Sequence, residues 1–186
     1  MNVKRIILCA IALLLVLSFG CNLRTDKTAE SRPTPVPDPP KPDVMMLFPE
    51  AVGVSPIDFD PDVSFGDQTY ITRAETVFDK SGERVGYAIG VKTRHAYNPP
   101  LELLLGVSAN GTTRGIVFLE LNETPGKGSK ADEPAFRDQF AGRSVDTFVL
   151  NGNVDAISGA TITSKAVVNA LNAGLAFFRE AILPGR

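Results

Sequence analysis

Four hydroxyl-bearing residues crowd the start of a predicted helix in the stretch DAISGATITSKAVVNAL, Asp155 to Leu171. They are Ser158, Thr161, Thr163 and Ser164. The first turn of a helix leaves several backbone N–H groups without an intrahelical partner and carries the positive end of the helix dipole. Small neighbours such as Gly159 and Ala160 would let an anion approach those groups closely. The stretch therefore allows phosphate binding without requiring it, and helix physics alone favours the simpler interpretation, in which one hydroxyl caps the helix and the others are solvated.

Metal-ion and dinucleotide chemistry find little support elsewhere in the sequence. His95 is the only histidine, expected at the surface or in a strand, and Cys9 and Cys21 belong to no Cys or His cluster. The stretch GKGSKA at 126–131 matches the G-x-G-x-x-A pattern of a dinucleotide-binding turn. However, Pro134 and a short helix follow it instead of a strand–helix–strand unit, and the P-loop pattern is also missing. We predict no metal site and no catalytic residue.

The elements that must position the hydroxyl residues begin with β-strands. Two apolar and β-branched runs, Leu101–Ala109 and Thr112–Leu121, flank Asn110-Gly111, a pair that favours a tight turn with two positive φ angles. Upstream, residues 73–93 predict two more strands around a turn at Lys80-Ser81-Gly82. We therefore expect an antiparallel sheet of at least four strands.

Helices are predicted after the sheet. Residues 133–140 place a proline at a helix start and two phenylalanines four positions apart, which predicts a short helix. The last stretch has apolar side chains at helical spacing, and Pro184-Gly185 is expected to end that helix. Strands followed by helices indicate an α+β fold, in which an antiparallel sheet packs against helices. The apolar face of the last helix is expected at Val167, Ala170, Leu171, Leu175, Phe178 and Ile182, and its polar face at Lys165, Asn169, Asn172 and Arg179.

The N-terminus has the pattern of a membrane-targeting segment. A basic start, Lys4-Arg5, precedes an uncharged apolar run at 6–21. Because this run is shorter than the about 20 residues that span a bilayer comfortably, residues 1–21 fit two interpretations. One is an uncleaved anchor helix; the other is a lipoprotein signal with a lipid on Cys21, although Ser18 stands where such signals usually carry an aliphatic residue. Both interpretations export the chain that follows.

A spacer and one domain make up the rest of the chain. Residues 22–43 are rich in proline and favour an extended polyproline II spacer, although a proline-rich motif for docking a partner has the same composition. Residues 44–186 suffice for a single domain with a packed core. The net charge of −2 gives no electrostatic footprint for nucleic acid.

The hydroxyl-rich stretch resembles the covalent flavin-attachment motif of the FMN-binding domain family. SGATITS at 158–164, preceded by Asp155, is similar to that motif in the G subunit of the Rnf ion-translocating electron-transport complex and in the C subunit of the sodium-translocating NADH:quinone oxidoreductase. Independently, LNETPGKGSK at 121–130 resembles the family's E-T-P-G-L-G segment, and FRDQFAGR at 136–143 resembles the stretch that follows it. Segments at 48–51, 86–91 and 103–120 occur in the family's order as well.

The resemblance implies which residues hold the flavin. In this family a flavin transferase takes FMN from FAD and joins its phosphate to the threonine after Gly-Ala, here Thr161. A helix start would stabilise the remaining negative charge by about 0.3 to 2 kcal/mol. Asp155 fits a determinant for the transferase or a structural turn residue. The residues expected to bind the cofactor are Thr161, Ser158, Gly159, Ala160, Thr163, Ser164, Glu123, Thr124, Gly126 and Lys127, of which Glu123, Thr124 and Gly126 match positions against the isoalloxazine ring.

Two departures from the family pattern limit what can be carried over. Lys127 stands where the family usually has leucine, so an apolar ring contact is replaced by methylenes with an ammonium at their end. We hypothesise that this ammonium stabilises the reduced, anionic flavin and raises its midpoint potential. In HAYNPP at 95–100 the family tends to have glycines around the tyrosine, so contacts of that loop are not carried over.

The function that the resemblance implies is electron carriage, and not turnover by this chain alone. The chain is expected to be a subunit with covalent FMN in a membrane-bound Rnf-type complex that couples electron transfer between ferredoxin and NAD to ion translocation. Its partners would be the other membrane and peripheral subunits and the flavin transferase. Its domain would lie on the periplasmic face of the bacterial cytoplasmic membrane. Alternatives are a free-standing exported FMN carrier serving another reductase and a lipoprotein that binds a partner or ligand without flavin.

Overall fold

The computed structural model describes residues 37–61, 65, 68–144 and 147–183. The predicted segment 1–21, most of the spacer and the expected helix end at Pro184-Gly185 lie outside these residues. Within the described part, no helix has both the length and the apolar character that a membrane span requires.

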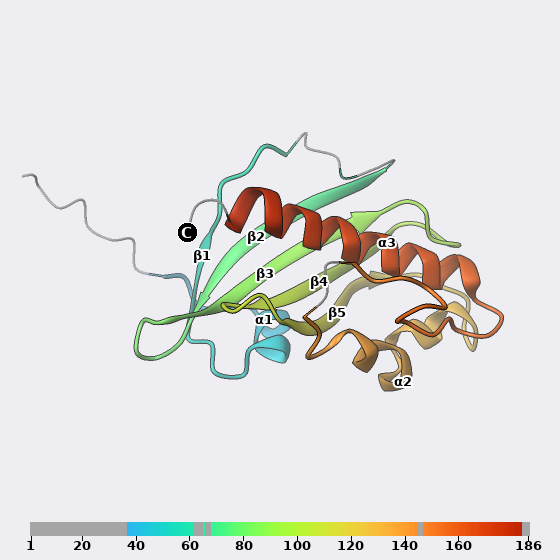
Figure 1. The fold of residues 1–186 in the computed structure, drawn as a ribbon, viewed down its shortest axis with the longest axis horizontal. Helices are drawn as coiled ribbons and strands as arrows, with labels where there is room; N and C mark the ends of the chain where they lie inside the picture. The colour runs from blue at the N-terminus through green and yellow to red at the C-terminus, as the bar shows by residue number, and fades with distance from the viewer. Residues whose placement is uncertain (1–36, 62–64, 66–67, 145–146, 184–186) are drawn as a thin grey trace, which may run out of the picture. The chain divides into compact units, whose positions relative to one another are not determined.

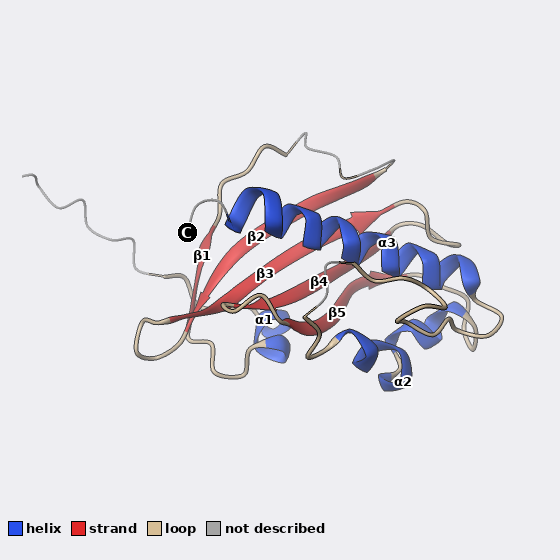
Figure 2. Ribbon diagram, in the orientation of Figure 1, coloured by secondary structure: helices blue, strands red, loops and turns tan. Residues whose placement is uncertain are grey.

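A five-stranded antiparallel meander forms the centre of the fold, as Figures 1 and 2 show. Its strand order follows the chain, so every neighbouring pair is joined by a local connection. The predicted α+β class and antiparallel sheet are confirmed. The strands are β1 (Gly53–Pro56), β2 (Thr69–Phe78), β3 (Arg84–Thr93), β4 (Leu101–Ser108) and β5 (Thr113–Leu121).

The two predicted hairpin turns form, but one prediction about their backbone was wrong. Gly111 has a positive φ of 88°, whereas Asn110 is not among the described residues with positive φ. Instead, the Asn110 Oδ1 accepts a hydrogen bond from the N–H of Thr112 at 3.0 Å, which is the ordinary way in which asparagine stabilises a turn. In the other turn, the Ser81 hydroxyl donates to Asp79 Oδ1 at 2.6 Å and lowers the pKa of that carboxyl.

The long C-terminal helix lies across one face of the sheet (Figure 1). Helix α3 (Thr161–Phe177) continues into a π-helical turn (Phe178–Ile182). All six positions of its predicted apolar face are buried, because they pack against strand residues such as Ile89 and Leu105. At Gly174 the helix approaches the sheet so closely that an added Cβ would stand 3.0 Å from the Leu105 side chain.

The opposite face of the sheet carries a smaller core. Helix α1 (Pro42–Leu47) contributes Val44 and Leu47, which pack with Phe48 against Ala88 and Leu104. These strand residues alternate with those facing α3, because successive side chains of a strand point to opposite faces. An ion pair between Asp43 of α1 and Arg73 of β2 also joins the helix to the sheet.

Short helical segments complete the fold. A 3-10 helix, η1 (Gly128–Asp132), follows the loop after β5. The predicted helix at 133–140 is present as α2 (Pro134–Arg137) and a further 3-10 turn, η2 (Asp138–Phe140). Its two phenylalanine rings meet edge to face at 5.2 Å. The end of the proline-rich stretch also belongs to the folded domain, since Asp38 forms a β-bridge with Val54 and α1 begins at Pro42.

The loops are sorted between the two ends of the sheet. Thr93 lies opposite Leu101, and Leu101 lies opposite Leu121, so the β3–β4 connection and the loop after β5 leave from the same end. The turns at 79–83 and 109–112 lie at the other end, together with the bridge between Asp38 and Val54. The two predicted motif segments therefore lie at one end of the sheet. The first described residues, near Asp38, lie at the opposite end.

Candidate functional site

A cavity of about 410 Å³ lies where the loop after β5 meets the start of α3. Its volume falls within the range of about 300 to 1,000 Å³ that small-molecule sites occupy. Two sequence segments that were predicted independently therefore face each other across one space. The residues that line it are Tyr97, Glu123, Thr124, Lys127, Gly128, Gly159, Ala160, Thr161, Ile162 and Thr163.

The first turn of α3 borders this cavity and has no side-chain cap. Ala160 occupies the N-cap position, and no side chain accepts a hydrogen bond there. Gly159, with a φ of 74°, turns the chain into the helix in a conformation that residues with a Cβ rarely adopt. Thr161 is exposed, so its hydroxyl can be reached from solvent. An uncapped helix start beside an accessible hydroxyl fits a phosphate group.

The predicted hydroxyl residues divide into two kinds. Thr161 and Thr163 line the cavity, and Thr163 does so although it is 1% exposed. Ser164 does not line it, because its Oγ is buried between the N–H of Ile157 and the carbonyl oxygen of Ala160, both at 3.0 Å. Ser158 is exposed outside the lining. The Ser164 hydroxyl therefore ties the preceding turn to the helix.

Glu123 joins two loops at the wall of the cavity. It follows the end of β5 and is 7% exposed. Its Oε1 accepts hydrogen bonds from the backbone N–H groups of Tyr97 at 3.0 Å and Asn98 at 3.4 Å. Because these donors belong to the β3–β4 loop, the carboxylate fixes that loop to the segment after β5.

Gly128 allows the second Glu123 oxygen and the Thr163 hydroxyl to come close to the same backbone. A Cβ at position 128 would stand 2.5 Å from Glu123 Oε2 and 2.7 Å from Thr163 Oγ1, so a side chain there would displace these groups. Gly126 is not in the lining; with a φ of 72° it shapes the turn, and its N–H donates to the Ser129 hydroxyl at 2.9 Å. The glycines of this motif thus have separate structural tasks.

Lys127 is the cationic residue of the lining. Its side chain is exposed at the cavity, and none of the ion pairs between described residues includes it. The acidic member of the lining, Glu123, is already bonded to two N–H groups. The ammonium of Lys127 is therefore available to a bound anion or to a ring that becomes negatively charged.

Three lining residues were missed from the sequence, namely Tyr97, Gly128 and Ile162. Ile162 lies inside the first motif, directly after Thr161, and that position could have marked it; the structure leaves it 52% exposed. Gly128 follows directly after Lys127 in the second motif. Tyr97 had no local signal, because the fold brings its loop to the cavity from a separate strand connection.

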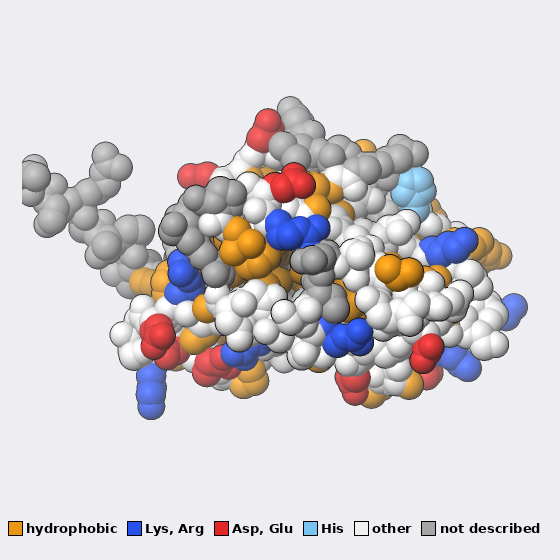
Figure 3. Space-filling view, in the orientation of Figure 1, with side chains coloured by type: hydrophobic (Ala, Val, Ile, Leu, Met, Phe, Trp, Pro, Cys, Tyr) orange, Lys and Arg blue, Asp and Glu red, His pale blue; other side chains and the backbone are white. Residues whose placement is uncertain are grey.

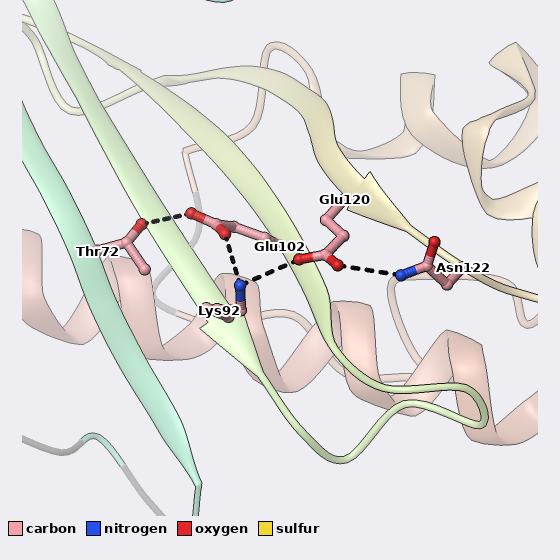
Figure 4. Close-up of polar contacts among 5 residues, drawn as sticks. All are labelled: Thr72, Lys92, Glu102, Glu120 and Asn122. Atoms are coloured by element: carbon pink, nitrogen blue, oxygen red, sulfur yellow. Dashed lines mark hydrogen bonds and ion pairs between the residues drawn. The ribbon is translucent and has the colours of Figure 1, made fainter.

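A chain of polar contacts crosses the face of the sheet opposite α3 and ends at Asn122, which directly precedes Glu123 in the sequence (Figure 4). Lys92 donates to Glu102 at 3.2 Å and to Glu120 at 3.0 Å. Thr72 donates to Glu102, and Asn122 donates to Glu120. The bonds to Glu120 and Glu102 raise the pKa of the Lys92 ammonium above its ordinary value of 10.5. The contacts bind β2, β3, β4 and β5 together where the cavity loop departs.

The segment before α3 is held by Gln139. The backbone N–H of Asp155 donates to Gln139 Oε1 at 2.7 Å, while the Asp155 side chain lies at the surface. Thus the short helices at 134–140 fix the segment that leads to Thr161 through one side chain, that of Gln139.

Among the described residues, no group of His, Cys, Asp and Glu is placed to hold a metal ion. His95 lies at the surface.

Charges of both signs are interspersed on the face that carries α3, as the space-filling view shows (Figure 3). Lys and Arg side chains alternate with Asp and Glu, and apolar side chains lie between them. This face therefore offers no surface of a single sign.

Comparison with known proteins shows that the segment around the cavity is similar to a described family. Residues 96–176 match the model of the FMN-binding domain family. Every residue that lines the cavity lies inside this segment. The resemblance predicted from the sequence is thereby confirmed over these residues.

Curated relatives and solved structures are similar to the chain over part of their length. The G subunit of the Na⁺-translocating ferredoxin:NAD⁺ oxidoreductase complex of Acetobacterium woodii is 36% identical over 109 residues, covering 54% of this chain and 52% of that protein. The G subunit of an ion-translocating oxidoreductase complex of Methanosarcina acetivorans is 40% identical over 101 residues, covering 52% and 53%. The chain thus spans about half the length of the curated relatives it matches. The crystal structure of Shewanella oneidensis NqrC shares 22% identity at a TM-score of 0.49, covering 72% of this chain and 83% of that one.

Proposed function

We propose that this chain is an electron-carrier subunit that holds FMN in the cavity between the loop after β5 and the start of α3. The observation that carries the proposal is the meeting of the uncapped helix start with the Glu123 loop inside the segment that matches the FMN-binding domain. Bound FMN would supply the capacity to take up and release one or two electrons. The protein positions the ring and sets its potential, so the chain alone is not a complete enzyme.

The residues present fit a phosphorylated, ring-bearing ligand. The N–H groups of the first turn of α3 suit the phosphate, and the buried hydroxyl of Thr163 adds a polar group on the same wall. Lys127 adds a positive charge, and Tyr97 and Ile162 add exposed apolar surface. A lining that joins anion donors with apolar side chains is what a flavin phosphate requires.

Thr161 is the proposed attachment point of FMN. In the attachment step a flavin transferase transfers the FMN phosphoryl group of FAD to the Thr161 hydroxyl; the hydroxyl loses its proton, and AMP leaves. The exposure of Thr161 and its place directly after the N-cap support this role. The remaining negative charge would then lie at the positive end of α3.

The proposed setting is a membrane-bound Rnf-type complex. Support comes from the relatives, whose names describe the G subunits of ferredoxin:NAD⁺ oxidoreductase and ion-translocating complexes. The partners would be the other membrane and peripheral subunits. The apolar run at 6–21 would attach the chain to the cytoplasmic membrane, as a helix or through a lipid on Cys21, with the domain on the periplasmic side.

Covalent flavin on a denaturing gel tests the proposal. The full chain is co-expressed with a flavin transferase and exported, and the denatured band is examined for ultraviolet-excited fluorescence. The wild-type band is expected to fluoresce, Thr161→Val to be dark, and the matched control Thr163→Val to keep its fluorescence. A dark wild-type band refutes both functions proposed with covalent flavin, and a dark band from protein whose native form also lacks flavin absorbance leaves the flavin-free binding lipoprotein. Fluorescence of Thr161→Val would move the attachment to another hydroxyl.

Purification from native membranes separates the complex subunit from a free-standing carrier. A detergent extract of the tagged holoprotein is expected to bring down the other subunits of an ion-translocating oxidoreductase. Recovery of the flavinylated chain by itself would favour a carrier that serves another reductase.

A further inference from the structure

Tyr97 is a large aromatic side chain on the wall of the cavity that the sequence motifs did not reveal. It is 62% exposed, although it lines a space of ligand size. An aromatic ring left in water at the edge of a cavity gains most when a second planar ring covers it. The ring is therefore placed to contact a ligand and does not belong to the hydrophobic core.

We infer that the Tyr97 ring packs against the isoalloxazine ring and that Glu123 is the positioning residue that holds it there. This inference rests on the proposed function. It assigns Tyr97 a contact that the loop's departure from the family pattern left undefined. It also gives the Glu123 carboxylate a task that does not require it to touch the flavin.

The hydrogen bonds of Glu123 carry the second half of the inference. One carboxylate oxygen receives the N–H groups of both Tyr97 and Asn98. A buried carboxylate bonded to two backbone donors is a rigid anchor, because removing it leaves both donors unpaired. The tyrosine ring is attached to the backbone at this anchor, so its direction depends on Glu123.

Contact between a phenol and a flavin has an optical signature. In light, the phenol gives one electron to the excited flavin, and that electron returns to the oxidised phenol in the dark. The cycle leaves both groups unchanged but shortens the fluorescence lifetime of the flavin. Because the transfer requires contact, the lifetime reports the distance between the two rings.

Time-resolved flavin fluorescence of the holoprotein tests the inference. Tyr97→Leu is expected to lengthen the lifetime severalfold, and Tyr97→Phe to lengthen it as well, because a phenyl ring keeps the shape but is a poor electron donor. Tyr70→Leu is the matched control, since Tyr70 is a 41% exposed tyrosine of β2 outside the cavity lining. Its lifetime should equal that of the wild type.

Glu123→Ala tests the positioning role. In the wild-type background it should lengthen and broaden the distribution of lifetimes, and in the Tyr97→Leu background it should add nothing. A full effect of Glu123→Ala in the absence of Tyr97 overturns the positioning role. A wild-type lifetime in both Tyr97 variants, measured on protein whose covalent flavin is verified by intact mass, overturns the contact while leaving the proposed function in place. Failure of the wild-type chain to acquire flavin overturns both.

Discussion

At the scale of single residues, neighbouring side chains of one kind have different tasks. Thr161 and Thr163 face the cavity, whereas Ser164 satisfies two backbone groups behind it. The sequence shows that hydroxyls gather at a helix start, but their directions depend on the exact position of the preceding turn. That position is set by Gly159 and by the bond between Gln139 and the Asp155 backbone, which comes from a distant segment.

Lys127→Leu provides a prediction at this scale. Replacing the lysine by the family's usual residue should lower the flavin midpoint potential, because the ammonium no longer stabilises the reduced, anionic ring. An ammonium about 6 Å from that charge at an effective dielectric of about 20 gives an upper limit of roughly 120 mV for a one-electron couple. Screening by water at this exposed position should reduce the shift to a few tens of millivolts, as an order of magnitude.

Spectroelectrochemical titration of the holoprotein measures this shift. Lys130→Leu removes the same charge from a neighbouring position that does not line the cavity, so it serves as the control. Equal potentials in wild type and Lys127→Leu would show that the ammonium does not reach the flavin.

At the scale of elements, the start of α3 depends on the link that Ser164 makes to the preceding turn. Ser164→Ala should lower the free energy of unfolding by about 1 to 3 kcal/mol, because the buried N–H of Ile157 loses its acceptor. The neighbouring exposed substitution Lys165→Ala should change stability by less than about 0.5 kcal/mol. Urea unfolding of the flavin-free chain provides the comparison. If the two variants are equally stable, the buried link contributes nothing.

Periodicity predicted the elements whose pattern repeats over many residues. β2 to β5 and the apolar face of α3 were all found, because a buried face imposes a regular pattern. β1 was missed, since its four residues, GVSP, are too few for an alternation to appear. The helix predicted over 133–140 changes to a 3-10 turn at Asp138, a change that spacing alone does not indicate.

The cavity could be predicted only in part. Glu123, Lys127 and Thr161 were identified from two motifs, and the structure brings these motifs together. Tyr97 could not be predicted, because its approach depends on the registers of β3 with β4 and of β4 with β5. Local sequence carries little information about contacts made through three strands.

At the scale of the whole molecule, the polar contacts across the sheet predict how stability depends on pH. The pKa of Lys92 is raised in the folded state. Its contribution to the free energy of unfolding is therefore complete at pH values below the unfolded-state pKa near 10.5, and it is lost as the pH rises through the folded-state pKa. The pKa of Asp79 is lowered from 3.8 in the folded state. Its contribution to the free energy of unfolding is therefore complete at pH values above 3.8, and it is lost as the pH falls through the folded-state pKa.

Comparison of wild type with Lys92→Met measures the alkaline part of this dependence. The difference in unfolding free energy should be constant from neutral pH up to about 10 and should shrink above 10.5, where the unfolded wild-type chain loses the proton first. Taking the difference removes the other lysines and the tyrosines, which titrate in both proteins. A difference that stays constant through strongly alkaline pH would show that the ion pairs do not stabilise the fold.

Because the loops are divided between the two ends of the sheet, the cavity lies far from the point where the chain enters the domain. The described chain enters beside the bridge of Asp38 with Val54, and the cavity lies at the far end of strands that are eight to ten residues long. At about 3.3 Å per residue, the sheet holds the cavity roughly 25 to 35 Å from that entry. A chain tethered by its N-terminus would carry this end as the free tip of an arm. Under the proposed function, short swings about such a tether would sweep the tip through a wide arc, so a single domain would meet electron donors and acceptors that are themselves far apart.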